Sequence, residues 1–207
     1  MQNEILIIHR DVKYPRIEIK TGKPVLIIPS NGKYDSAELI SRHKNWLDQK
    51  MAFVKSIQKK YKKLKIYSRS EEELSALTSK IVEKFSKKLK KKPQKIIFRN
   101  MKTKWGSCGI NGSITLNRLL KFLPPALIGY VVFHELLHLT LRNHNKKFWL
   151  AISQEFKNYP KYEEKLFGYW FLVNKANEAL ENNHAPNLIK PQLKPRYAQV
   201  IIAEEMR

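Results

Sequence analysis

Two histidines and a glutamate are the residues of this sequence whose spacing most clearly suggests chemistry. His134 and His138 are four residues apart, and on a helix this spacing places both side chains on one face, where they can bind one metal ion. Glu135 follows the first histidine, beside the ligand face, which is the position of a base acting on a metal-bound water. The HExxH pattern also arises by chance, so its neighbours have to support it.

The surrounding residues predict that this segment is a buried helix. Pro124 and Pro125 precede it, and proline is suited to the first helical position. Residues 126–141 are apolar nearly all the way round, as in a helix that is buried on every side. Buried histidine and glutamate side chains need polar partners, and a metal ion provides them. The alternative is a pair of core histidines bonded to the backbone.

His144 is the expected third ligand. It follows His138 by six residues, and an unbroken helix would turn it away from the ligand face. We therefore expect the helix to end at Arg142–Asn143 and a new helix to be capped by Asn145. Three protein ligands with a fourth position left open are typical of catalytic zinc sites. The competing third ligands are the later glutamates Glu155, Glu163 and Glu164.

Four motifs around this site resemble those of the YgjP-like zinc metallopeptidases. They are residues 99–108 (RNMKTKWGSC), 114–117 (ITLN), 130–135 (YVVFHE), and Asn143–His144 with Phe148–Trp149. The similarity is most specific over residues 96–150. The resemblance implies a zincin-type fold, one zinc ion bound by the three histidines, and Glu135 as the catalytic base. The resemblance indicates the reaction, peptide-bond hydrolysis, but does not indicate a natural substrate.

Length and composition predict one soluble domain. The 207 residues are 43% hydrophobic and include one cysteine, which is enough chain for a real core and excludes an internal disulfide. The first residues lack a basic, apolar leader, and no apolar run is long enough to span a bilayer. We expect a cytoplasmic protein without a membrane segment, with a metallopeptidase domain over residues 1–181 and a C-terminal extension over 182–207.

The charge is strongly basic. Forty Lys and Arg residues against eighteen Asp and Glu residues give a formal net charge of +22, which attracts polyanions such as nucleic acid. Lysines crowd two segments, Lys55–Lys65 and Lys84–Lys95. These segments could form a patch that binds nucleic acid without sequence preference, or they could simply be solvated.

Hydrophobic periodicity predicts an α+β fold in which a small antiparallel sheet precedes helices and the metal-site core. Capping signals at Asp35 and Ser70 start two amphipathic helices, and Asn111–Gly112 signals a hairpin. The expected N-terminal region, 1–34, has strands at 4–9, 16–20 and 24–29, and the region 35–92 is helical. The expected core, 93–181, has strands at 95–99, 105–108 and 113–117. It also has helices at 145–157 and 161–181. Residues 197–203 could form a terminal strand.

The hairpin strand next to the metal helix is a candidate for substrate binding. By analogy with zincins, its edge could take an extended peptide as an added strand, with Gly106 permitting close backbone approach. We expect Cys108 to pack in the core; the alternative is a zinc-thiolate role. The candidates for the oxyanion donor are Arg99, Tyr130 and Asn143.

These observations favour a zinc-dependent metallopeptidase that hydrolyses peptide bonds through a water activated by Glu135. One alternative keeps this chemistry and adds recruitment to nucleic-acid-bound proteins by the basic surface. A second alternative is a nucleic-acid-binding protein in which the zinc site is not catalytic. Salt-dependent DNA binding without proteolysis would favour the second alternative.

Overall fold

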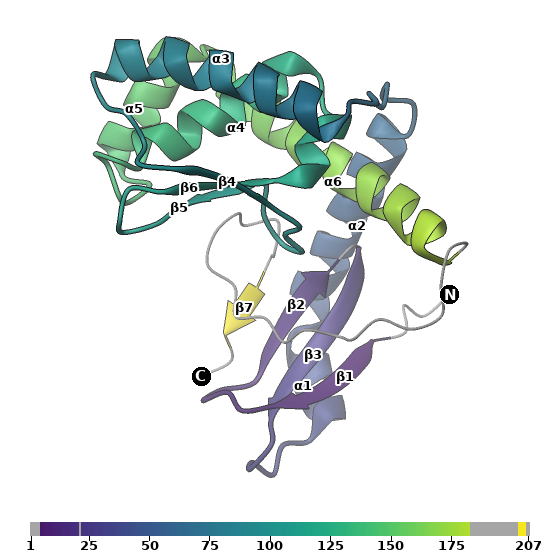
Figure 1. Ribbon diagram of the computed structural model, residues 1–207. Coiled ribbons are helices and arrows are strands. Elements are labelled where there is room, and N and C mark those ends of the chain that lie inside the picture. The colour runs from purple at the N-terminus through teal and green to yellow at the C-terminus, as the bar shows by residue number, and fades with distance from the viewer. Residues whose placement is uncertain (1–4, 21, 183–202, 206–207) are drawn as a thin grey trace.

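The chain adopts the predicted α+β fold, with helices packed on two small sheets (Figure 1). The computed structural model describes residues 5–20, 22–182 and 203–205. Its helices are α1 (Ser36–Arg42), α2 (Lys44–Tyr61), α3 (Glu71–Leu89), α4 (Pro125–Leu137), α5 (Lys146–Glu155) and α6 (Tyr159–Asn182), with a short 3-10 helix, η1, at Arg118–Phe122.

The first sheet has a different strand pairing from the one predicted. Its strands β1 (Leu6–Arg10), β2 (Arg16–Lys20), β3 (Lys23–Pro29) and β7 (Ala203–Glu205) lie in the order β1-β3-β2-β7. β2 and β3 are antiparallel as expected, but β1 pairs with β3 in parallel, so the sheet is mixed. β3 is buried from Pro24 to Pro29. Such an apolar strand is most stable at the centre of a sheet, where it has a neighbouring strand on each side.

The second sheet carries the predicted hairpin. β5 (Gly106–Cys108) and β6 (Ile114–Asn117) are antiparallel, and β4 (Ile96–Arg99) pairs with the other side of β6 in parallel. Gly112 in the turn has a φ of 76°, which glycine adopts without strain. In the described part of the chain β5 is therefore an edge strand, and it lies beside α4.

The predicted helix starts are confirmed by their caps. The Asp35 side chain accepts hydrogen bonds from the backbone N–H groups of Ala37 and Glu38, and Ser70 and Glu73 form a reciprocal capping box. The helix expected after Asp35 is interrupted at His43, which separates α1 from α2. Of the terminal strand expected at 197–203, only Ala203 lies within the described residues, where it begins β7.

Two hydrophobic clusters form the core, and α6 contributes to both. Leu166, Tyr169 and Trp170 pack into the larger cluster, around α4 and the second sheet. Phe167 and Phe171 pack into the smaller cluster, between α2 and the first sheet. α6 thus lies where the two parts of the molecule meet (Figure 1). None of the helices within the described ranges has the length and apolarity needed to cross a membrane.

Candidate metal centre

α4 supplies two of the three histidines, and it ends earlier than predicted. The helix stops at Leu137 with His138 as its C-cap, instead of continuing to Arg142–Asn143. Asn143 does not adopt the left-handed conformation expected there, since Lys90 is the one non-glycine residue with positive φ in the described ranges. Beyond the helix, Nδ1 of His138 lies 2.9 Å from the carbonyl oxygen of Leu141. This side-chain hydrogen bond stabilises a tight turn where the helix was expected to continue. The hydrophobic pattern of the sequence gives no information about such a bond.

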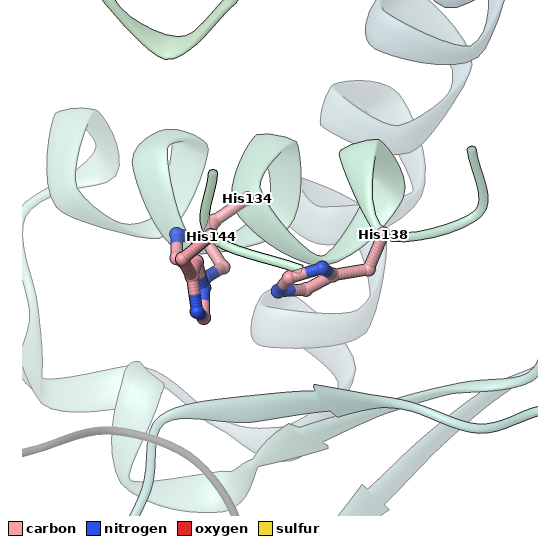
Figure 2. A group of neighbouring side chains, drawn as sticks. All are labelled: His134, His138 and His144. Atoms are coloured by element: carbon pink, nitrogen blue, oxygen red, sulfur yellow. The ribbon is translucent and has the colours of Figure 1, made fainter. Parts of the chain in front are cut away.

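The turn after α4 brings His144 back to the other two histidines. Nε2 of His144 lies 2.9 Å from Nε2 of His134, and the ligand atoms of the three histidines all lie within 4.8 Å of one another. Figure 2 shows the three side chains converging at this end of α4, with the rings of His134 and His144 side by side. The convergence expected from the sequence is therefore present in the structure.

α5 packs against the three imidazole rings through Phe148. Its N-cap is Asn145, as predicted, whose side chain accepts a hydrogen bond from the N–H of Phe148. Phe148 is fully buried, and its ring centroid lies 4.6 to 4.9 Å from the centroid of each imidazole. One aromatic side chain therefore limits the movement of all three histidines.

The three histidines fit a divalent metal ion. Because a carbonyl oxygen only accepts, Nδ1 of His138 carries the proton, which leaves its Nε2 lone pair for a metal. Burial lowers the pKa of all three rings, and that of His134 falls well below its usual range. Metal ligation requires these neutral imidazoles. Nitrogens around a tetrahedral zinc are about 3.3 Å apart, so the three ligand atoms, which lie within 4.8 Å of one another, would have to move closer together to bind one ion.

Glu135 lies between α4 and the edge strand β5. Its side chain is 6% exposed, and a Cβ atom placed on Gly106 would come within 2.7 Å of its Cγ. The sequence suggests that Gly106 lets a substrate backbone come close, which stays a prediction; in the structure the group next to Gly106 is the Glu135 side chain. Burial raises the pKa of Glu135 to about 8, against the opposing charge of Lys104. A carboxyl group with a pKa near neutrality can both accept and return a proton.

Lys104 and Cys108 are neighbours of Glu135 that sequence reasoning did not identify. Lys104, Gly106 and Cys108 alternate along the chain, so they share one face of the β5 segment. Burial lowers the pKa of Lys104 while the charge of Glu135 raises it. Burial raises the pKa of Cys108, Arg142 lowers it, and Glu135 raises it. The sequence did contain a signal for this: residues two apart in a strand point to the same side, so Lys104 and Cys108 lie on the same side of the strand as Gly106, the side next to Glu135.

Arg142 links the ligand turn to the hairpin. Its guanidinium donates to the carbonyl oxygens of Gly109 and Ile110 at 2.9 and 3.1 Å, at the tip of the β5–β6 hairpin. Its Nη1 also lies 3.8 Å from Sγ of Cys108. Because Arg142 is two residues before His144, these bonds fix the third histidine relative to the edge strand.

The three glutamates that could have been the third ligand have other partners. Glu155 pairs with Lys88 and Glu164 with Lys60, while Glu163 accepts a hydrogen bond from the Tyr130 hydroxyl. None of these glutamates belongs to the histidine cluster found in the described residues. Of the three oxyanion-donor candidates, Tyr130 is thus engaged with Glu163, Arg99 lies on β4 at the opposite edge from β5, and Asn143 is exposed in the ligand turn.

Comparison with known proteins identifies the family. The YgjP-like metallopeptidase domain matches residues 53–168, more than half of the 207 residues, and the chain belongs to this family of metallopeptidases. Among solved structures, the metallopeptidase zymogen of Pyrococcus abyssi abylysin is similar, with 21% identity and a TM-score of 0.41, over 44% of this chain and 91% of that one. A search of curated proteins finds no match.

Proposed function

We propose that this chain is a zinc-dependent metallopeptidase in which His134, His138 and His144 bind one zinc ion and Glu135 is the catalytic base. The observation that carries the proposal is the convergence of the three histidine nitrogens within 4.8 Å, next to a buried glutamate. When bound, zinc would supply Lewis acidity, polarising the substrate carbonyl and lowering the pKa of a water to about 7.

The role proposed for Glu135 is proton transfer. The carboxylate would take a proton from the attacking water and return it to the leaving amine. Its burial supports this role, because the raised pKa of about 8 matches a group that must be ionised and protonated in turn. Lys104 opposes this rise, so it would keep part of the Glu135 population ionised near neutral pH.

The proposed substrate is a peptide bound along β5. In the described structure this strand pairs with β6 on one side only and runs beside α4. An extended peptide could complete the sheet through backbone hydrogen bonds, which would align its scissile bond with the histidines. Arg142 would hold this edge in register with the third ligand through its bonds to the hairpin tip.

Metal analysis of single variants tests the proposal. We expect about one zinc per chain in the wild type and loss of zinc from His134→Ala and His138→Ala, since each removes one ligand. His144→Ala should bind zinc more weakly. Glu135→Gln should keep the metal but lose hydrolysis of any peptide that the wild type cleaves. Unchanged zinc content in the histidine variants, or full activity of Glu135→Gln, would refute the assignment.

A further inference from the structure

His144 is the most exposed of the three histidines. It lies in the segment between α4 and α5, and its side chain is exposed, whereas His134 is half-buried and His138 is buried. A side chain that faces solvent loses rotamer freedom when a metal fixes it in one orientation. Neighbours that restrain its ring before the metal binds reduce this cost. The residues packed against His144 therefore bear on the metal affinity of the site.

Trp149 stacks on the imidazole ring of His144. The two ring centroids are 5.5 Å apart, and the ring planes meet at 24°. Phe148 meets the same imidazole at 85°, edge to face, so it restrains the ring in a different direction. The indole also lies 6.4 Å from the centroid of the His134 ring. Trp149 thus lies along the face of the third proposed ligand and close to the first.

The indole of Trp149 is itself held by a second ring. Tyr159 stacks on it, with 5.1 Å between the ring centroids and 20° between the ring planes. Tyr159 is the first residue of α6, whereas Trp149 belongs to α5. Both side chains are half-buried and pack against the larger hydrophobic cluster. Contacts from two helices therefore fix the ring that faces His144.

We propose that Trp149 is a positioning residue, which holds the His144 ring in the orientation that binds the metal. The inference rests on the proposed zinc site and adds to it a residue that is not a ligand. The stacked indole would restrict rotation of the imidazole, so less conformational entropy would be lost on metal binding. Metal ligation also makes the imidazole more positive, and tryptophan attracts a positive group within about 6 Å of its ring more strongly than phenylalanine does.

The zinc affinity of Trp149 variants, measured by chelator competition, tests the inference. Trp149→Leu keeps an apolar side chain but removes the stacked ring. We expect its zinc Kd to be about tenfold higher than that of the wild type, as for other residues that orient ligands. Trp149→Phe keeps a smaller ring, so its Kd should lie between those of the wild type and Trp149→Leu.

Trp46→Leu is the matched control. Trp46 is half-buried in α2, where it packs against the smaller hydrophobic cluster. Both substitutions remove a half-buried indole, so thermal melts of the two metal-free variants should show similar losses of stability. Only Trp149→Leu should lose zinc affinity. An equal loss of affinity in Trp46→Leu would mean that reduced stability weakens the site, and the inference would fail.

Tryptophan fluorescence adds a readout that a purely structural role of Trp149 would not produce. Zinc bound to His144 would change the surroundings of the stacked indole, so saturating zinc should change the emission of the wild type and of Trp46→Phe. This change should be largely absent from Trp149→Phe, which keeps an aromatic side chain and so preserves the test if Trp149→Leu does not fold. The full change in Trp149→Phe would contradict the inference.

The remaining outcomes separate this inference from the proposed function. If the wild type binds zinc and Trp149→Leu binds it equally tightly, the inference is overturned and the zinc proposal stands. If the wild type itself binds no zinc, both are overturned.

Discussion

Gly106 and Glu135 approach so closely that the glycine cannot be replaced without displacing the glutamate. A Cβ atom at position 106 would lie 2.7 Å from Cγ and 2.8 Å from Oε1 of Glu135. Both residues are buried, and Gly106 is fixed in β5 by its pairing with Leu116. The edge strand therefore determines where the proposed base can sit.

Gly106→Ala should impair hydrolysis far more than metal binding. The added methyl would push Glu135 aside, and a displacement of about 1 Å in a catalytic group can lower the rate on the order of 100-fold. Overpacking should also cost about 1–3 kcal/mol of stability. The measurement is kcat/KM on a peptide cleaved by the wild type, together with zinc content. Wild-type kcat/KM in this variant would show that the contact does not position Glu135.

The metal-free protein should become less stable as pH rises, because of Glu135. Its pKa in the folded state is about 8, above the ordinary value of 4.5. The folded form thus keeps a proton that the unfolded form releases, so this contribution is complete below pH 4.5 and lost as pH rises through about 8. The loss should be on the order of a few kcal/mol.

Thermal melts of the metal-free wild type and Glu135→Gln between pH 5 and 9 isolate this effect. Glutamine cannot ionise, so the stability advantage of the variant should grow as pH rises toward about 9. The histidines are common to both proteins and cancel in the comparison. A pH-independent difference would mean that Glu135 is already ionised in the folded metal-free protein.

Arg142→Ala should weaken zinc binding although Arg142 is not a ligand. The substitution removes the bonds to the carbonyls of Gly109 and Ile110 and frees the turn that carries His144. Outer residues that orient ligands typically account for a tenfold or greater change in metal affinity, so we expect the zinc Kd to rise about tenfold. Chelator competition measures it, with Lys147→Ala as a control that should bind zinc as the wild type does.

Nucleic-acid binding by the lysine-rich segments is a separate prediction. Lys55–Lys65 precedes α3 and Lys84–Lys95 includes its C-terminal end, so the segments lie toward opposite ends of a 19-residue helix (Figure 1). That the two segments form one patch stays a prediction. If Lys55–Lys65 binds DNA, affinity should fall steeply with salt.

Fluorescence anisotropy at two ionic strengths tests this with Lys59, Lys60, Lys62 and Lys63 all changed to Ser. These substitutions should abolish binding by that segment, whereas duplex and single strands should bind comparably to the wild type, since few aromatic side chains are close to it. Binding that is absent at low salt, or unaffected by the substitutions, would indicate a solvated surface. DNA binding without proteolysis would favour a non-catalytic protein.

Local patterns predicted most of the histidine cluster. The i, i+4 spacing of His134 and His138 and the cap formed by Asn145 depend on nearby residues only, so the sequence alone indicates them. The turn that returns His144 was also expected, but its position was wrong by about one helical turn. It depends on the bond from His138 to the Leu141 carbonyl, a side-chain contact that has no periodicity.

Contacts between distant segments were not predictable in the same way. β1 pairs in parallel with β3 because the apolar strand β3 is stabilised by a neighbouring strand on each side. The order of the strands along the chain does not reveal this pairing. The role of Arg142 was missed for a similar reason. Its position at the expected helix end suggested an interaction with the helix dipole, whereas its partners are more than 30 residues away, at the hairpin tip.

The position of α6 has a consequence for how the molecule responds to its metal. Successive side chains of this helix enter both hydrophobic clusters, with Trp170 on the side of the metal centre and Phe171 on the side of the first sheet. If either hydrophobic cluster unfolded, one face of α6 would lose its packing contacts. The two clusters should therefore unfold in a single cooperative transition. A metal ion held at the end of α4 would then protect amides of β3 from hydrogen exchange, although none of the three histidines lies in the first sheet.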